Sequence, residues 1–255
     1  MLFDTHAHLD FADFDGDRDD IVDRAVRAGV TCIIDPGCDV PTSLKSVELS
    51  RKYEEVYAAV GIHPNNTGSA APGDFTEIAR LVAENDVVAI GETGLDYYRD
   101  RSPRDVQVRA FRGHLDLARE HDLPVIVHFR SVESDGIDST GEQYFEGIRG
   151  VFHCFGGSVD FARQVLDMGF YVGFDGPLTY KQSDRVDVAR AVPLERCLIE
   201  TDAPFLTPQK YRGKRNEPSY VIEVAEKLAE IKGIDVDEVI EVTTANAAKL
   251  FGFDV

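Results

Sequence analysis

The 255-residue sequence has no tryptophan, two methionines, four cysteines and no apolar run approaching the roughly 20 residues of a membrane-spanning helix. The cysteines lack the CxxC spacing of zinc or redox motifs, and four are too few for a disulfide scaffold of this length. We therefore expect reduced, mostly buried thiols at Cys32, Cys38, Cys154 and Cys197. The first residues lack a basic segment followed by a long apolar one, so we expect a soluble, cytoplasmic protein without a membrane partner.

Basic residues are also scarce, because 27 lysines and arginines stand against 46 aspartates and glutamates, which gives a formal net charge of -19. Aspartate outnumbers glutamate, and arginine outnumbers lysine. An acidic, lysine-poor surface is typical of proteins that stay soluble in concentrated salt. In dilute buffer, the same charges repel one another and destabilise the compact state. The composition therefore predicts a halophilic protein.

We expect this protein to gain stability as salt is added. In about 1 M KCl the Debye length falls to about 3 Å, so repulsion between surface carboxylates is largely screened. The temperature of half-unfolding, followed by circular dichroism, should therefore rise between dilute buffer and this salt concentration. A temperature that stays constant or falls would contradict the halophilic interpretation.

Short apolar stretches rich in β-formers alternate with longer amphipathic ones, which predicts repeated βα units and a parallel sheet. Helices on the outside of such a sheet bury both of its faces, which explains why the predicted strands are apolar throughout. Eight units predict a single (β/α)8 TIM barrel domain over residues 1–255. The predicted strands are residues 2–8, 30–35, 56–63, 87–92, 125–128, 150–154, 170–174 and 197–202.

Other segments complete this prediction. Apolar residues recur at helical spacing in residues 19–28, 105–121 and 160–168, and the chain from Pro218 onward predicts two helices separated near Gly233. Residues 131–143 are polar and have few apolar anchors, so we predict a surface loop after the fifth strand. His114 and His121 fall among charged residues on a helical pattern, and we predict that both are exposed.

Six residues of metal-binding types lie at or just past the ends of predicted strands. The carboxyl ends of barrel strands share one rim, and residues i and i+2 of a strand point the same way, so these side chains can meet. A buried set of imidazoles and carboxylates is costly unless a cation compensates it. The six are His6, His8, Glu92, His128, His153 and Asp202.

Mixed nitrogen and oxygen ligands suit Zn²⁺, Mn²⁺ or Mg²⁺, and the lack of thiolates argues against a structural zinc cage. Six ligands exceed what one catalytic ion takes while keeping a position open for water. The sequence therefore predicts two divalent metal ions. Such pairs activate water and hold the attacking and leaving oxygens of an ester or phosphodiester, so we expect hydrolysis.

Seven short motifs occur in order along nearly the whole chain: DTHAHL at 4–9, GIHP at 61–64, GETGLDY at 91–97, PVIVH at 124–128, HCF at 153–155, TDAP at 201–204 and RGKRNEP at 212–218. In these motifs the sequence resembles the TatD-type metal-dependent hydrolases and deoxyribonucleases of the amidohydrolase superfamily. The resemblance implies a TIM barrel with one site at the carboxyl ends of its strands.

The resemblance also implies roles for the ligand set. His6, His8 and Asp202 would hold the first ion, His128 and His153 would hold the second, and Glu92 would bridge them. Asp202 would also accept the proton of the attacking water, which gives Asp202 and Glu92 as the catalytic residues.

Five further residues are candidates for substrate binding. The resemblance implies that His63 faces the substrate, although a turn-capping role is the alternative. Arg212, Lys214 and Arg215 lie in the loop after the eighth strand, where barrel enzymes often bind phosphate, or they balance local acidity. Arg130 is a second possible phosphate contact, because a guanidinium binds phosphate with two parallel hydrogen bonds.

The predicted function is a divalent-metal-dependent hydrolase, most simply a deoxyribonuclease of the 3'-5' exonuclease type acting on a nucleic acid substrate. Tyr97 and Tyr98 would offer stacking surfaces for bases, or they simply pack. An acidic body repels a polyanion, so local contacts must supply the attraction. Two alternatives stay open: a carboxylic ester hydrolase such as a deacylase of aminoacyl-RNA, and a non-catalytic metal-binding barrel that serves as a partner platform.

Overall fold

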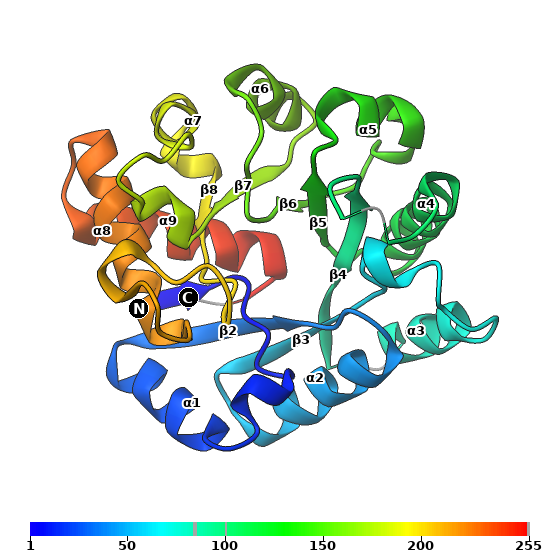
Figure 1. Ribbon diagram of the computed structural model, residues 1–255, viewed down its shortest axis with the longest axis horizontal. Coiled ribbons are helices and arrows are strands. Elements are labelled where there is room, and N and C mark those ends of the chain that lie inside the picture. The colour runs from blue at the N-terminus through cyan, green and yellow to red at the C-terminus, as the bar shows by residue number, and fades with distance from the viewer. Residues whose placement is uncertain (84–85, 100, 254–255) are drawn as a thin grey trace.

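A computed structural model describes residues 1–83, 86–99 and 101–253 of the protein. Within these residues, eight parallel strands follow one another around a barrel in sequence order (Figure 1). The predicted (β/α)8 fold is confirmed. The strands are β1 (Leu2–Asp4), β2 (Val30–Pro36), β3 (Val56–Val60), β4 (Val87–Asp96), β5 (Val125–Arg130), β6 (Gly150–Phe152), β7 (Tyr171–Phe174) and β8 (Cys197–Ile199).

The barrel closes between its first and last strands through the segments that follow them. The Thr5 amide donates to the carbonyl of Ile199 at 3.2 Å, and the Asp202 amide donates to the carbonyl of His6 at 2.8 Å. The His8 amide donates to Ala203, also at 2.8 Å. The same hydrogen bonds therefore close the barrel and bring three predicted metal ligands to one edge.

Helices cover the outside of the barrel, as the βα repeat predicts (Figure 1). They are α1 (Arg18–Arg27), α2 (Val40–Lys52), α3 (Asp74–Val82), α4 (Arg104–His121), α5 (Glu133–Thr140), α6 (Val159–Asp167), α7 (Val186–Ala191), α8 (Val221–Lys232) and α9 (Val236–Phe251). Local signals set several ends: Asp39 and Thr42 form a capping box on α2, and Gly233 ends α8 with a φ of 70°. The two predicted C-terminal helices and the break near Gly233 are confirmed.

The interior of the barrel is apolar below the rim. One buried cluster draws a side chain from every strand, including Phe3, Ile126 and Tyr171, and packs them against Leu250 and Phe251 of α9. A second cluster lies between the strands and the surrounding helices. The strands are therefore buried on both faces, which is why their sequences lack polar alternation.

Six predicted strand ends and one predicted loop require correction. β4 and β5 continue past Glu92 and His128, to Asp96 and Arg130. The strands predicted over 2–8, 56–63, 150–154 and 197–202 end earlier, at Asp4, Val60, Phe152 and Ile199, because the residues beyond these points leave the sheet register. Residues 131–143 are not a loop, because they contain α5 and a 3-10 turn over Glu142–Tyr144. The segment folds because Ile137 is fully buried and Arg112 of α4 donates to the last carbonyls of α5. Both anchors depend on tertiary packing, so the polar composition of the segment did not indicate that it would fold.

Two further observations concern the cysteines and the helices. All four cysteines are free; Cys32, Cys38 and Cys197 are buried, and Cys154 is partly buried. No helix in the described part of the chain combines the length and apolar character needed to cross a membrane.

His114 is buried, which corrects the prediction of an exposed side chain. It has no accessible surface, and its ring lies edge-on to Phe75 with centroids 5.1 Å apart. Its Nδ1–H donates to the carbonyl of Ala110 at 2.7 Å, while Nε2 accepts from the amide of Ile62 at 3.1 Å. Burial lowers the pKa of His114 to about 4, so the ring stays neutral and ties α4 to the end of β3.

The buried His114 predicts a pH dependence of stability. Its folded pKa lies below the unfolded value of about 6.5, so between these values the unfolded chain binds the extra proton and stability falls as pH falls. The His114→Gln variant should lose about 1 kcal/mol less than the wild type between pH 7.5 and about 5.5, measured by urea unfolding. His121→Gln, at an exposed position of the same helix, is the matched control. An unchanged pH dependence in His114→Gln would contradict the assignment.

Candidate metal centre

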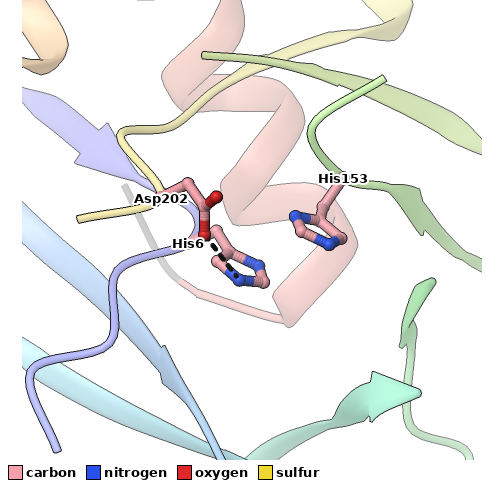
Figure 2. Close-up of side chains that lie close together, drawn as sticks. All are labelled: His6, His153 and Asp202. Atoms are coloured by element: carbon pink, nitrogen blue, oxygen red, sulfur yellow. Dashed lines mark ion pairs between the residues drawn. The ribbon is translucent and has the colours of Figure 1, made fainter. Parts of the chain in front are cut away.

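The predicted ligands converge on one rim of the barrel, although they come from five places in the chain. His6 and His8 follow β1, Glu92 lies in β4, and His128 lies in β5; His153 follows β6 and Asp202 follows β8. Figure 2 shows His6, His153 and Asp202 arriving from three different segments. The His6 and His153 rings are stacked, with centroids 4.0 Å apart.

Four ligand atoms form the group that we call the His6 group: Nε2 of His6, Nε2 of His8, Oε2 of Glu92 and Oδ1 of Asp202. His6 Nε2 lies 3.2 Å from His8 Nε2, and the contacts from these nitrogens to the two carboxylates measure 3.5 or 3.6 Å. A tetrahedron around zinc bonded to nitrogen and oxygen has edges of about 3.3 to 3.6 Å. The donor types and spacing of the His6 group therefore fit a divalent cation.

The other oxygen of Glu92 faces a second set, the His128 group. Glu92 Oε1 lies 2.6 Å from Nδ1 of His128, 2.8 Å from Nε2 of His153 and 3.6 Å from Nε2 of His63. The two shorter contacts are hydrogen-bond distances, tighter than the ligand spacing of the His6 group. One buried carboxylate thus stands between two imidazole groups.

The pKa shifts of Glu92 and His153 show that the cluster favours positive charge beside the Glu92 carboxylate. Burial opposes ionisation of Glu92, but the fields of His153, His63 and His128 outweigh it and hold its pKa well below the usual value. Burial likewise opposes protonation of His153, yet the Glu92 carboxylate raises the pKa of His153 well above its usual range. A proton or another cation is therefore needed at this position, which matches the chemistry of the donor set.

Two carboxylates that the sequence analysis missed stand behind the ligands. Asp96 Oδ2 lies 3.4 Å from Nε2 of His128, and Glu200 Oε1 lies 3.7 Å from Nδ1 of His153. Both are fully buried. A carboxylate behind an imidazole fixes its orientation and makes it a stronger ligand. The signal was available, because Glu200 precedes Asp202 by two positions and Asp96 lies in the GETGLDY motif.

Glycine at position 94 allows β4 and β5 to approach closely beside the ligands. Gly94 pairs with His128 in the strand register and has a φ of 138°. A Cβ atom there would lie 2.2 Å from the carbonyl oxygen of His128, which excludes any side chain. The close pairing holds the Glu92 and His128 segments side by side.

His63 has the turn-capping role that the sequence left open, and its other ring nitrogen faces the cluster. Its Nδ1 accepts a hydrogen bond from the amide of Asn65 at 3.0 Å and so caps the turn Pro64–Asn66. Its Nε2 faces Glu92 from the opposite side of the ring. Burial lowers the pKa of His63 to about 3, which leaves a neutral imidazole beside the cluster.

One of the four basic residues predicted to bind substrate, Arg215, is already engaged in an ion pair. Arg215 forms an ion pair with Asp17 at 2.5 Å and stacks over Phe14, which favours the charge-balancing alternative for this residue. The guanidinium of Arg212 lies 4.3 Å from the ring centre of Tyr180.

The other two basic candidates also lie against aromatic rings. Arg130 lies 4.3 Å from the ring centre of Tyr98, and Lys214 lies 5.8 Å from that of Tyr211. Among the described residues, neither cation makes an ion pair with a carboxylate. Their contact with a substrate stays a prediction.

The fold and the cluster together define a parallel-barrel protein with a candidate metal centre at the carboxyl ends of its strands. A family model described as TatD related DNase matches residues 3–252. The chain belongs to this family.

Individual relatives agree with this assignment. The chain is 44% identical over 252 residues to the uncharacterized metal-dependent hydrolase YabD of Bacillus subtilis, covering 98% of this chain and 99% of that protein. It is 33% identical over 257 residues to the 3'-5' ssDNA/RNA exonuclease TatD of Salmonella typhimurium, covering 98% of each. The crystal structure of YjjV, a TatD homolog from Escherichia coli K12, superposes with a TM-score of 0.93 at 30% identity, covering 99% of this chain and 98% of that one.

Proposed function

We propose that this protein is a metal-dependent hydrolase that removes nucleotides from the 3' end of single-stranded nucleic acid. The observation that carries the proposal is the position of Glu92, whose two carboxylate oxygens face two separate imidazole groups. Membership of the TatD related DNase family and the printed name of the Salmonella relative support the choice of a phosphodiester. A single domain over residues 1–255 is part of the same proposal.

The residues present would hold two divalent ions. His6, His8 and Asp202 would bind one, His128 and His153 would bind the other, and Glu92 would contact both. Bound divalent ions supply Lewis acidity and make water a stronger acid near neutral pH. The distances between the imidazole nitrogens of the His6 group and its two carboxylates support the first position, and the two imidazoles that face the other oxygen of Glu92 support the second.

The protein's own side chains would supply proton transfer and orientation. Asp202 would accept the proton of the attacking water, because the hydrogen bond to His8 and the charge of His6 outweigh its burial and lower its pKa. His63, neutral and capped by its own turn, would orient a substrate oxygen through Nε2. Asp96 and Glu200 would hold the second pair of imidazoles in place.

The test uses the purified protein and a 3'-end-labelled single-stranded DNA with a matching RNA. Mg²⁺, Mn²⁺ and Zn²⁺ are added separately, in dilute buffer and in about 1 M KCl. Added salt screens the repulsion between the acidic protein and the nucleic acid, which favours binding, but it also weakens the contacts to phosphate. We expect release of labelled mononucleotide that EDTA abolishes. Nucleic acid that stays intact with every metal would refute the proposal.

The carboxylic ester alternative keeps the same site, and the name of the Bacillus relative specifies a hydrolase without a substrate. Aminoacyl-RNA and a simple aryl ester therefore belong in the same assay. Faster hydrolysis of either one than of DNA would favour the alternative. The non-catalytic barrel would be favoured if His128→Ala left both hydrolysis and the unfolding temperature of the metal-loaded protein unchanged.

A further inference from the structure

The helices α4 and α5 are neighbours on the outside of the barrel (Figure 1). A groove lies between them, lined at one end by Ser131, which follows β5. Its volume is about 720 Å³, and its walls include Arg104, Arg109 and Arg112 from α4 together with Tyr97 and Ser131. Three arginines in one groove are notable because the chain has only 27 basic residues and a net charge of -19. The groove also contains two aspartates, so arginines outnumber acidic residues there, whereas acidic residues outnumber basic ones over the whole chain.

The arginines differ in how many of their donors are already used. Arg112 is committed to the fold, because it donates to carbonyls of Thr140 and Ser139. Arg109 forms an exposed ion pair with Asp105 at 2.6 Å, a kind of contact that contributes little and is readily exchanged. Arg104 is exposed and, among the described residues, makes no ion pair with a carboxylate.

Arg104 is also held in a fixed orientation. Its guanidinium lies over the ring of Tyr97, 4.1 Å from the ring centre. Stacking occupies the face of the guanidinium and leaves its N–H donors free around the edge, which is how arginine presents itself to phosphate. The neighbouring Tyr98 holds Arg130 in the same way, at 4.3 Å. Two consecutive tyrosines therefore carry two oriented arginines.

This pair connects the groove to the metal centre. Asp96, the residue before Tyr97, faces His128 at 3.4 Å, and the Tyr97 amide donates to the carbonyl of Arg130 at 3.0 Å. Arg130 lies two residues after His128 in β5, and Ser131, which follows β5, lines the groove. Two residues of the groove wall, Tyr97 and Ser131, therefore belong to the segments that directly follow Asp96 and the His128 strand, and the rest of the wall extends along α4 and α5.

The geometry points to a binding path for single-stranded nucleic acid: the nucleotides beyond the cleaved one pass Arg130 on Tyr98 and Arg104 on Tyr97 and enter the groove between α4 and α5. Arg104 and Arg109 contact successive phosphates there, and the exposed ring of Tyr98 offers a face for a base. The inference rests on the proposed exonuclease function and adds the route by which the strand is held. A protein this acidic needs such a local concentration of arginine to hold a polyanion.

The test compares substrate lengths in the metal-loaded full-length enzyme. The variant Arg104→Gln/Arg109→Gln removes two charges while keeping polar side chains at exposed positions. Its kcat/KM should fall about tenfold for a thymidine 12-mer, as expected for lost charged hydrogen bonds, and less than about twofold for the dinucleotide, which does not reach the groove. The matched control is Arg163→Gln/Arg190→Gln, which removes two exposed arginines that pair with aspartates on α6 and α7. The control should show no dependence on substrate length.

A second readout measures binding without turnover. Every protein in this experiment also carries Asp202→Asn, so that the oligonucleotide is not degraded. Fluorescence anisotropy of a labelled 12-mer then gives the salt dependence of the dissociation constant. Each lost phosphate contact should reduce the slope of log affinity against log salt by about 0.7 for a single strand. The groove double variant should therefore lose about 1.4 from this slope, because two phosphate contacts at about 0.7 each are lost, and the control variant should lose nothing.

The outcomes separate this inference from the proposed function. If the wild type degrades the 12-mer but the groove variant loses equally on both lengths, or loses nothing, the path is wrong and the exonuclease function stands. If the wild type hydrolyses neither oligonucleotide while it hydrolyses an aryl ester, the proposed function fails, and the path fails with it. Circular dichroism melting of each variant verifies that the fold is retained.

Discussion

Replacing Glu92 with glutamine is expected to lower metal content and activity together. Glu92 offers one oxygen to each imidazole group, whereas glutamine offers one oxygen and an N–H₂ group that repels a cation. Changes to residues that only support metal ligands cost about 10-fold to 100-fold in metal affinity or activity, so this variant should lose more than about 100-fold in both.

Metal content by mass spectrometry and initial rates at saturating metal together test this expectation for Glu92. Glu77→Gln is the control, because Glu77 is a glutamate on α3 that pairs with Arg80 far from the site. Full metal content and a rate within about threefold of the wild type would show that Glu92 bridges nothing. Loss of metal with an unchanged unfolding temperature in EDTA would separate a ligand role from a structural one.

The variant Asp202→Asn should lose catalysis with a smaller effect on metal content. Asp202 is one of four donors in the His6 group, and asparagine keeps an oxygen for that position but accepts no proton. Removal of a general base costs between about 10²-fold and 10⁴-fold in kcat, and we expect a loss in this range.

The measurement for Asp202→Asn is kcat under saturating metal and substrate, as a function of pH. The lowered pKa of Asp202 means that it is ionised throughout the neutral range, so the wild-type rate should not fall until pH drops toward acid values. The variant should lack this acid limb. Asp187→Asn, at an exposed aspartate of α7, is the matched control. A variant with wild-type kcat would remove Asp202 from proton transfer.

Much of the barrel followed from local properties of the chain. Uniformly apolar strands such as residues 125–128 alternate with amphipathic segments, and a parallel sheet covered by helices is the arrangement that buries both patterns. The six candidate ligands were predictable for the same reason, because polar residues such as Glu92 and His153 stand at the ends of apolar runs in the sequence. Parallel strands carry such residues to a single rim.

The errors arose where packing overrode local composition. The polar segment at residues 131–143 forms α5 because Arg112, from another helix, satisfies its terminal carbonyls. His114 is surrounded by charged residues in the sequence, yet it is buried because both ring nitrogens find backbone partners. Asp96 was overlooked because the predicted strand stopped at Glu92, whereas β4 continues to Asp96. For residues 131–143 and for His114, the decisive partner is distant in the sequence. For Asp96, the predicted strand ended too early.

The sequence by itself determined the barrel, its family and the kinds of donor atoms at the rim, since these depend on periodicity and on residue type at strand ends. Tertiary structure alone decided that His6 and Asp202, which are far apart in the sequence, meet at 3.6 Å, and that each oxygen of Glu92 faces a different imidazole group. It also turned Arg215 toward Asp17 and set Arg104 on Tyr97. Strand register and barrel closure fix these distances, and both are properties of the assembled sheet that no single segment encodes.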